Sequence, residues 1–281
     1  MMRRSLGFNI MIGVAVTVLV VVTLAPLLWL FIMSISAPVE LTRIPLHWLP
    51  DRPDFSRYAR LFGLTGDAAG TSFLAALRNS LVVSFSATAI ALAAGIPAAY
   101  SFSRFRGRMG LLYGFLGVYM VPPVAFVLPL YMVFSQLGLL NNVVALIAVY
   151  CTILLPFSTW LLKNNFDEVP REVEEAAQMD GAGLLGAIRH VTLPLARPAL
   201  AAAALFALLL AWDEFFYALI YTNDLRAQTL PVAIADFAAG RATDYGLISA
   251  VGVLAALPPV IIAFFLQRSL VSGLSAGGIK G

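Results

Sequence analysis

The stretch EVEEAAQMDGAGLLGAIRHVTLPLARPAL, residues 172–200, interrupts a chain that is otherwise strongly apolar. It contains three glutamates, one aspartate, two arginines and a histidine, and long hydrophobic runs flank it on both sides. Ionised side chains are costly inside a bilayer, so the stretch is too charged to insert, and it is too short to fold alone. Its role depends on the apolar segments that it connects and on the side of the membrane that it faces.

The composition of the whole chain predicts an integral membrane protein. Of the 281 residues, 60% are hydrophobic and only 12% are charged, whereas soluble domains carry about 25% charged residues. The net charge of +3 is small and the basic residues are scattered, so we expect no nucleic-acid partner. The single cysteine, Cys151, lies in an apolar run, which argues against an intrachain disulfide or a cysteine-based metal site.

Six apolar stretches are long enough to cross a bilayer, which takes about 20 residues. The first follows Met-Met-Arg-Arg, but its apolar run is too long for a signal peptide and no small-x-small cleavage site follows, so we expect a retained helix. The predicted fold is an all-α polytopic membrane protein in which residues 1–281 form one transmembrane domain. The six predicted spans are about 9–35, 79–101, 111–135, 142–162, 199–222 and 246–267.

The distribution of lysine and arginine predicts the orientation of these spans. With the N-terminus inside, the inner segments carry more Lys and Arg than the outer ones. The short loop SRFRGR, residues 103–108, holds three arginines between spans two and three, and short loops follow the positive-inside rule best. Both termini are therefore predicted to be cytoplasmic. So is the loop 163–198, which contains most of the quoted stretch and connects spans four and five.

The pattern inside this loop predicts a short helix followed by a turn. Pro170 suits the first turn of a helix, and the three glutamates follow at the end where the helix macrodipole favours negative charge. Gly181 and Gly183 are expected to end the helix, as glycine often does past a C-terminus. The residues predicted to share one small, mostly apolar face are Val173, Ala176, Ala177 and Asp180.

A second short helix is predicted from Leu184 to His190, with Leu193-Pro194 and Pro198 stopping it before the next span. The resulting cytoplasmic helix–turn–helix allows two interpretations. It is either a solvated connector or a docking element, whose small residues enter a cleft on a cytoplasmic partner while Glu174 or Glu175 pairs with a partner arginine.

One set of positions in this stretch forms a recognisable signature: Glu175, Ala176, Ala177, Gly181, Val191, Leu193 and Pro194. Their spacing resembles the EAA signature of permeases from binding-protein-dependent ABC importers, with valine where isoleucine is usual. Residues 53–62, 120–142, 211–222, 229–234 and 273–281 are similar to further segments of the carbohydrate-type permeases. At position 213, where this chain has aspartate, asparagine is more usual in the family.

The resemblance implies a function and a set of partners. The chain is expected to be a transmembrane subunit of an ATP-driven importer, similar to the maltose/trehalose-class permeases of the bacterial or archaeal plasma (inner) membrane. It would form half of the translocation path for a sugar or sugar-like solute. The implied partners are a second homologous permease subunit, two ATPase subunits and an extracytoplasmic solute-binding protein, all assembled in or on the lipid bilayer.

The resemblance also implies which residues contact the ATPase. The quoted stretch would be the coupling helix, and the tail GLSAGGIKG would thread beside the ATPase subunits, since residues 275–281 have too much glycine to form a stable helix alone. The residues expected to dock are Glu174, Glu175, Ala176, Ala177, Asp180, Gly181, Leu193 and Pro194, together with Gly277, Gly278 and Lys280 of the tail.

Enzymatic and metal-binding functions are not expected for this chain. It has no G-x-x-x-x-G-K-[ST] loop for phosphates, and neither Lys163 nor Lys280 lies in such a context. ATP and magnesium are therefore expected on the partner ATPase subunits, with no cofactor in this chain. His47 and His190 are far apart in sequence and on opposite predicted sides of the membrane, so no metal site is expected.

The fifth predicted span contains two adjacent carboxylates about fourteen residues from its start, Asp213 and Glu214. Charges at such depth usually face a cavity, a partner or the bundle interior; alternatively, the span is tilted or broken there and the pair lies near the outer interface. The candidates for lining the solute path are Trp212, Asp213, Glu214, Phe216 and Tyr217. The alternative function is a self-contained secondary transporter or channel that uses the two carboxylates.

Overall fold

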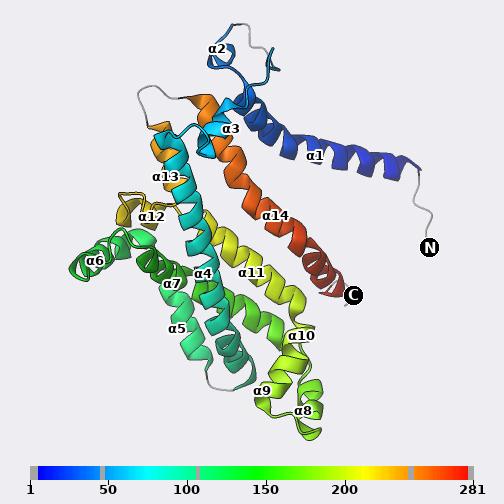
Figure 1. Cartoon of the computed structure of the whole chain (residues 1–281). Helices are drawn as coiled ribbons and strands as arrows, with labels where there is room; N and C mark the ends of the chain where they lie inside the picture. The colour runs from blue at the N-terminus through cyan, green and yellow to red at the C-terminus, as the bar shows by residue number, and fades with distance from the viewer. Residues whose placement is uncertain (1–5, 45–47, 106–107, 240–243, 278–281) are drawn as a thin grey trace. The chain divides into compact units, whose positions relative to one another are not determined.

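The computed structural model describes residues 6–44, 48–105, 108–239 and 244–277 of the chain (Figure 1). All regular structure within these ranges is helical. The elements are α1 (Leu6–Ile35), α2 (Pro38–Leu41), α3 (Ser56–Leu61), α4 (Ala68–Arg104), α5 (Met109–Tyr119), α6 (Pro123–Gln136), α7 (Val143–Asp167), α8 (Arg171–Met179), α9 (Leu184–Ala187), the π-helical turn η1 (Ile188–Thr192), α10 (Leu193–Leu195), α11 (Arg197–Trp212), α12 (Phe216–Tyr221), α13 (Leu230–Ala238) and α14 (Tyr245–Gly277).

Four helices in the described ranges are long and apolar enough to cross a bilayer. Two bent helix pairs also pass the same test, so the number of candidate spans is four to six. The prediction of an all-helical membrane protein is confirmed, whereas the number and direction of the spans stay predictions. The four helices are Gly7–Ile35, Ala68–Arg104, Val143–Asp167 and Tyr245–Gln267.

The span predicted at 111–135 is not one straight helix. Helices α5 and α6 cover it and meet at an angle of 86°. The bend follows from Pro122 and Pro123, because a proline disfavours the helical conformation of the residue before it. Pro122 has extended dihedral angles (φ −57°, ψ 134°), and Pro123 begins the new helix, a position where its missing N–H costs nothing.

The backbone forms two compact units. The first comprises Met1–Leu74 and Ala233–Leu257, and the second comprises Ala75–Val232 and Pro258–Gly281. The long helices α4 and α14 contribute residues to both. The first unit contains the strongly apolar α1, and the second contains the quoted stretch and both carboxylates of the fifth predicted span.

In the first unit, one buried arginine joins three segments. The guanidinium of Arg57, on α3, donates to the carbonyl oxygens of Ser34 (3.2 Å) and Ser36 (2.6 Å) at the end of α1. It also pairs with Asp244, just before α14, at 3.2 Å. A Cβ atom at Gly246 would clash with this guanidinium, so glycine there lets Arg57 keep its position. Arg57 therefore fixes the end of α1 against α3 and the start of α14.

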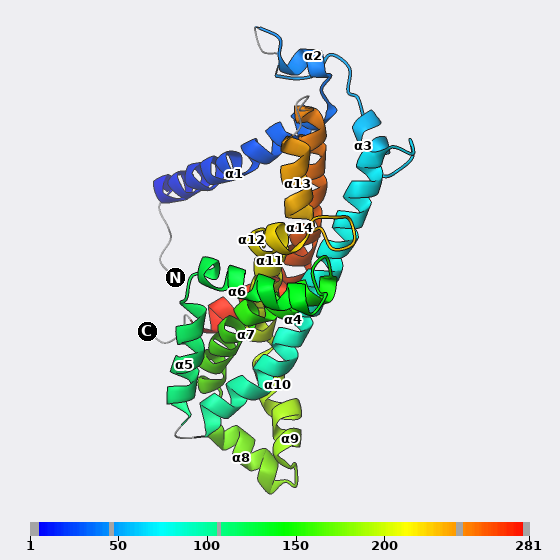
Figure 2. The same cartoon turned by 90° about the vertical axis from the view of Figure 1, so that its left-hand side faces the viewer.

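The core of the second unit lies between α4, α7, α11 and α12. Gly95 on α4 allows a close approach to α7, since a Cβ atom at this position would lie 3.4 Å from the hydroxyl of Thr159. Small residues of this kind let helices pack closely in membranes. Figures 1 and 2 both show α8 and α9 beyond the C-terminal end of α4, at one end of this unit. The larger buried side chains of this core include Val83, Phe134, Leu146, Val149, Tyr150, Leu154, Tyr217 and Tyr221.

Candidate functional site

Helix α8 has the ends that its sequence predicts. It begins after Pro170, and Gly181 adopts a positive φ of 91° just past its C-terminus. The N–H of Gly181 donates to the carbonyl of Gln178 (3.1 Å), and the N–H of Ala182 donates to that of Ala177 (3.0 Å). This pair of bonds is a Schellman motif, which satisfies the last carbonyls of a helix and favours glycine at the left-handed position. The predicted turn at Gly181 is confirmed.

The burial pattern of α8 is the reverse of that of an ordinary surface helix, and α9 also leaves large apolar side chains exposed. The one buried residue of α8 is Glu174, which is 3% exposed. Apolar side chains face outward instead, with Met179 83% exposed and Leu185 77% exposed, and Val173 and Leu184 exposed beside them. Surface helices of a globular protein bury their apolar side and expose their charged side. The outward apolar side chains of Val173, Met179, Leu184 and Leu185 are called the docking face below.

The Glu174 carboxylate lies in a cage of four hydrogen-bond donors. Arg104, the last residue of α4, binds it with two bonds, from Nε to Oε2 (2.9 Å) and from Nη2 to Oε1 (2.7 Å). Tyr100 Oη donates to Oε2 (3.0 Å), and Thr192 Oγ1 donates to Oε1 (2.7 Å). Both charged side chains are almost fully buried. One carboxylate thus joins α4, α8 and η1.

The cage sets the charge state of Glu174. Burial alone raises the pKa of its carboxyl, but the hydrogen bonds from Arg104 and Thr192 outweigh burial and hold this pKa below its usual value. The stability that the carboxylate contributes is therefore present above the pKa of glutamate in the unfolded chain. It is lost as the pH falls through the lower pKa of the folded chain. Near neutral pH the ion pair is intact.

A second layer of contacts ties the cage to the end of α7. Arg104 Nη2 also donates to the carbonyl of Val169 (3.0 Å), which follows α7. Ser103 Oγ donates to Asp167 (2.6 Å), and Lys163 pairs with Asp167 at 2.6 Å. Below the cage an apolar cluster includes Tyr100 and Phe166, whose rings meet edge to face at 6.5 Å. The ends of α4 and α7 are thus joined to α8 by polar and apolar contacts.

The second predicted helix of the loop differs from the structure. It was expected to end at His190, before Leu193-Pro194, but α9 continues through η1 into α10 and the break comes at Ala196. There the chain bends by 78° into α11. Proline lacks the N–H that an α-helix needs in its interior, and one wider π turn is a common way to accommodate such an interruption. The π turn places Thr192 against Glu174.

The structure separates the predicted docking residues into three groups. Glu174 points inward, where Arg104 binds its carboxylate, so of the two glutamates expected to pair with a partner arginine only Glu175 is left exposed. Its neighbour Glu175 is exposed, as are Ala176, Asp180 and Gly181, while Ala177, Leu193 and Pro194 are half-buried.

The tail and one histidine fall partly outside the described residues. Gly278, Lys280 and His47 lie there, so the predictions made for them stay open. Helix α14 continues ten residues past the predicted span end and reaches Gly277. Residues 275–277 are helical as the end of this long helix, which is compatible with the expectation that the tail forms no stable helix alone, because a preceding helix can carry glycine that could not start one.

The fifth predicted span is broken at its two carboxylates, as one of the two alternatives from the sequence allowed. Helix α11 ends at Trp212 and α12 begins at Phe216. The carboxylate of Glu214 accepts the N–H groups of Tyr217 (2.9 Å) and Ala218 (3.3 Å), so it caps α12. Asp213 is exposed, and its carboxylate makes no hydrogen bond to the described part of the chain. Of the other path candidates, Trp212 and Tyr217 are buried and Phe216 is half-buried.

An aromatic cluster supports this break, and it is not among the features that the sequence predicts. Tyr221 stacks on Tyr217 with ring centroids 5.8 Å apart and meets Phe134 of α6 edge to face at 5.3 Å. Its hydroxyl donates to the carbonyl of Val127 (3.0 Å), inside α6. The i, i+4 spacing of the two tyrosines was the signal available in the sequence, but the contact with α6 depends on the bend at Pro122–Pro123.

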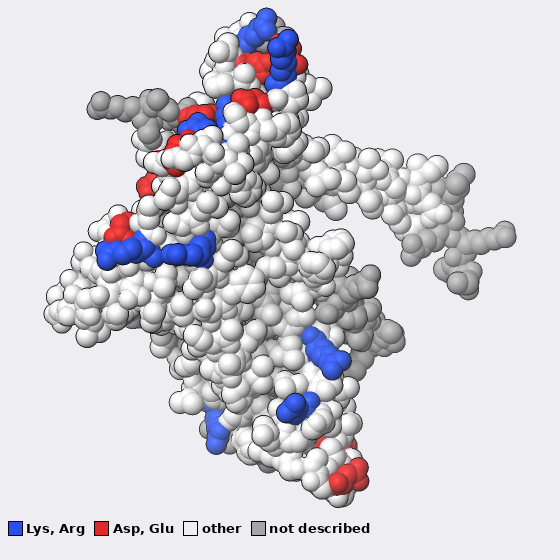
Figure 3. All heavy atoms as spheres, in the orientation of Figure 1, with Lys and Arg blue, Asp and Glu red and all other residues white. Residues whose placement is uncertain are grey.

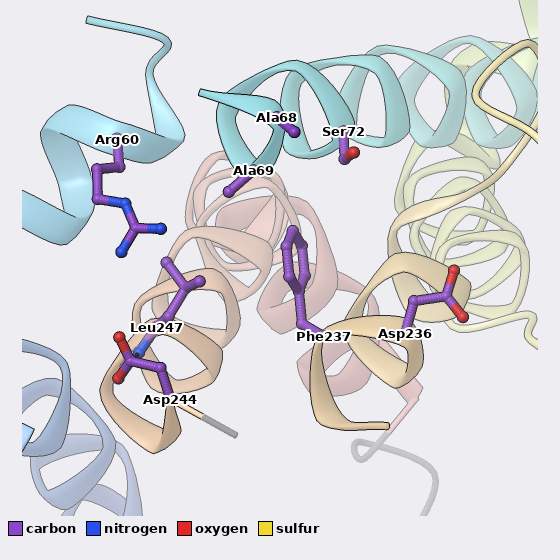
Figure 4. Close-up of a pocket in the computed structure, with 8 residues that line it drawn as sticks. All are labelled: Arg60, Ala68, Ala69, Ser72, Asp236, Phe237, Asp244 and Leu247. Carbon is purple, nitrogen blue, oxygen red and sulfur yellow. Dashed lines mark hydrogen bonds between the residues drawn. The ribbon is translucent and has the colours of Figure 1, made fainter. Parts of the chain in front are cut away.

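The first unit contains a cavity of about 520 Å³ between α3, α13 and the starts of α4 and α14 (Figure 4). Arg60, Ser72 and the ring of Phe237 line it. Its charged groups are already engaged, since Arg60 pairs with Asp67 at 2.8 Å and Asp244 pairs with Arg57. None of the residues predicted to dock or to line the path belongs to this cavity.

Comparison with known proteins identifies the family. A family model described as the binding-protein-dependent transport system inner membrane component matches residues 91–276. The chain belongs to this family. It is 34% identical over 270 residues to the sulfoquinovosyl glycerol transport system permease protein SmoH of Agrobacterium fabrum, covering 95% of this chain and 93% of that protein. It is 31% identical over 283 residues to the trehalose/maltose transport system permease protein MalG of Thermococcus litoralis, covering 100% of both.

A solved structure shows the same fold. It is the crystal structure of a bacterial ABC transporter involved in the import of the acidic polysaccharide alginate. One of its chains matches with a TM-score of 0.77 and 24% identity, covering 94% of this chain and 98% of that chain.

Family membership confirms several predictions. The chain is a multi-pass inner-membrane permease subunit of an ABC transporter, and the transport complex includes a binding protein. It is not an enzyme: the permease family carries no cofactor, and ATP is hydrolysed on partner subunits. The alternative of a self-contained secondary transporter or channel is wrong.

Proposed function

We propose that this permease forms half of the translocation path for a sugar or sugar-like solute, with residues 1–281 as one transmembrane domain. Its partners would be a second homologous permease, two ATPase subunits and an extracytoplasmic solute-binding protein. The loop 163–198 would lie in the cytoplasm, where α8–α10 docks into an ATPase subunit. The solute class is supported by relatives named for sulfoquinovosyl glycerol and for trehalose and maltose.

The observation that carries the docking proposal is the docking face itself. Four apolar side chains at the tip of the second unit point away from their own chain, and an exposed apolar cluster marks an interaction surface. The helices α8 and α9 at this tip belong to the charged loop 163–198, so these side chains would face water rather than lipid. Figure 3 shows acidic side chains at this tip and separate basic ones above it. Charged groups around an apolar centre are the usual anatomy of a protein–protein interface.

Glu175 would provide the charged contact of this interface. It is exposed beside the docking face, whereas the neighbouring Glu174 is bound internally. A basic residue of the ATPase could therefore pair with Glu175 and fix the register of docking. In the tail, Gly277, Gly278 and Lys280 would add a second contact, because α14 extends about 15 Å beyond the predicted end of its span.

Charging the docking face tests the proposal. In the importer purified with its ATPase and binding protein, Met179→Asp combined with Leu185→Asp should lower the amount of ATPase that co-purifies. Central apolar side chains of interfaces are worth about 1–2 kcal/mol each, so we expect a loss of about tenfold or more. Leu64→Asp is the matched control, because Leu64 is equally exposed but lies between α3 and α4. Full ATPase recovery with the double variant would refute docking by this face.

A further inference from the structure

We infer that Glu174 and Arg104 are positioning residues for transport: their buried pair is the joint that makes α4 move with α8 when the ATPase displaces the docking segment. This inference rests on the proposed docking of α8 and extends it into the membrane. Neither residue touches the ATPase or the solute. Both act through the elements that they hold together.

Helix α8 has no other buried attachment of its own. Glu174 is its one buried residue, and its apolar side chains Val173 and Met179 point outward. Most helices are held to their protein by an apolar face, which tolerates sliding because dispersion contacts are non-directional. Here the buried attachment is a single carboxylate with four directed hydrogen bonds. At the start of the helix, Arg171 adds one more bond, to the carbonyl of Ser103 at the end of α4 (3.0 Å). The docking face is therefore free to bind a partner while Glu174 holds the helix to its own chain.

The geometry of the pair resists rotation. Arg104 binds both carboxylate oxygens, at 2.9 and 2.7 Å, and such a two-bond pair fixes orientation as well as distance. A third guanidinium bond, to the carbonyl of Val169 at 3.0 Å, holds the end of α7 in the same arrangement. Since Arg104 is the last residue of α4, a displacement of α8 acts directly on the end of a 37-residue helix.

Stability alone does not account for this pair. Replacing a buried ion pair by well-packed apolar side chains is often neutral or stabilising, because the charges must be desolvated. The surrounding cluster of Tyr100, Phe166 and Leu162 is already apolar, so an apolar contact could hold α8 there as firmly. What the ion pair adds is a fixed direction between α8 and α4, as the transmission of a movement requires.

The test measures solute transported per ATP hydrolysed, in the complete importer reconstituted into liposomes with its binding protein. Glu174→Gln and Arg104→Gln should each lower this ratio about fivefold or more, as expected for loss of a coupling energy, while ATPase association stays at the wild-type level. The exchanged pair Arg104→Glu with Glu174→Arg should restore most of the ratio. Glu172→Gln is the matched control, because Glu172 lies in the same helix but is exposed.

Two milder variants keep the test decisive if the charge variants do not assemble. Thr192→Val and Tyr100→Phe each remove one hydrogen bond to Glu174 and leave the ion pair, and each should lower the ratio about twofold, the loss that about 0.4 kcal/mol produces. An unchanged ratio in assembled Glu174→Gln, or in both mild variants, would overturn the inference. So would single variants with a low ratio that the exchanged pair fails to raise. Failure of the docking proposal is separate, because it appears as unchanged ATPase recovery in the Met179/Leu185 variant.

Discussion

At the scale of single residues, two glutamates of the second unit make contacts that their sequence context does not reveal. Glu174 and Glu175 are adjacent in a helix, yet one is buried against Arg104 and the other is exposed. Glu214 and Asp213 are adjacent in a predicted span, yet one caps α12 and the other is exposed. In α8 the helix geometry sends neighbouring side chains about 100° apart, and at the break after α11 only Glu214 meets the free N–H groups of α12. In both pairs the surrounding elements decide which carboxylate is bound.

The cap of α12 gives a test at this scale. Glu214→Ala removes the acceptor for the N–H groups of Tyr217 and Ala218, and loss of a cap typically costs about 1 kcal/mol. Asp213→Ala removes a neighbouring carboxylate of similar size that makes no such bonds. Thermal unfolding of the purified complex in detergent should show a lower midpoint for Glu214→Ala than for Asp213→Ala. Equal midpoints would mean that the cap does not hold α12.

At the scale of elements, the breaks between helices position the site, and not every proline makes one. Pro122 and Pro123 separate α5 from α6, whereas Pro97, Pro156 and Pro258 lie inside continuous helices. Neighbouring helices and local adjustments can compensate for the lost backbone bond in a membrane helix. The sequence shows every proline, but only the packing around each one decides whether the helix continues.

The turn after α8 gives a test at the scale of elements. Gly181 has a φ of +91°, and a Cβ atom there would meet nothing within 4 Å. Gly181→Ala therefore causes backbone strain alone, about 1–2 kcal/mol for a left-handed residue with a side chain. We expect faster hydrogen exchange of the amides at the end of α8 and a lower ratio of transport to ATP hydrolysis.

The control for this test lies two residues further on. Gly183 also has open space around it, but its φ is −63°, which any residue adopts. Gly183→Ala should therefore leave hydrogen exchange at the end of α8 unchanged. If both variants behave alike, the left-handed turn is not what shapes the end of the docking segment.

The sequence predicted local features of these elements better than their contacts. The start of α8 and the turn at Gly181 follow from proline and glycine chemistry, which acts within a few residues. The inward orientation of Glu174 could not be predicted, because its partner Arg104 is 70 residues away. The π turn at Thr192 and the aromatic contact of Tyr221 with α6 likewise depend on elements that are distant in the chain.

At the scale of the whole molecule, the described surface is that of a subunit made for an assembly. Helix α1 exposes most of its apolar side chains, among them Val18, Leu19 and Val22, and such a surface suits lipid or another membrane helix. The docking face also exposes apolar side chains, but it lies on a polar loop rather than on an apolar helix. A surface of this kind suits a chain that works inside a larger transport complex, which agrees with the family of this chain.

The exposed carboxylate of Asp213 gives the last test, on the path itself. It lies at the break between α11 and α12, where helix interruptions line solute sites in transporters, and Trp212 and Phe216 flank it. If Asp213 lines the path beside the partner permease, it accepts hydrogen bonds from solute hydroxyls, which asparagine can also do. Asp213→Asn should keep solute uptake in liposomes, whereas Asp213→Leu should lower it about tenfold, because a hydroxyl left unpaired costs about 1–3 kcal/mol. Both variants should assemble, since the side chain holds no part of the described fold. Full uptake with leucine would show that this side chain does not hold the solute and that the solute is bound elsewhere. Equal loss of uptake with asparagine and leucine would show that the charge, rather than the hydrogen bonding, is what matters at this break.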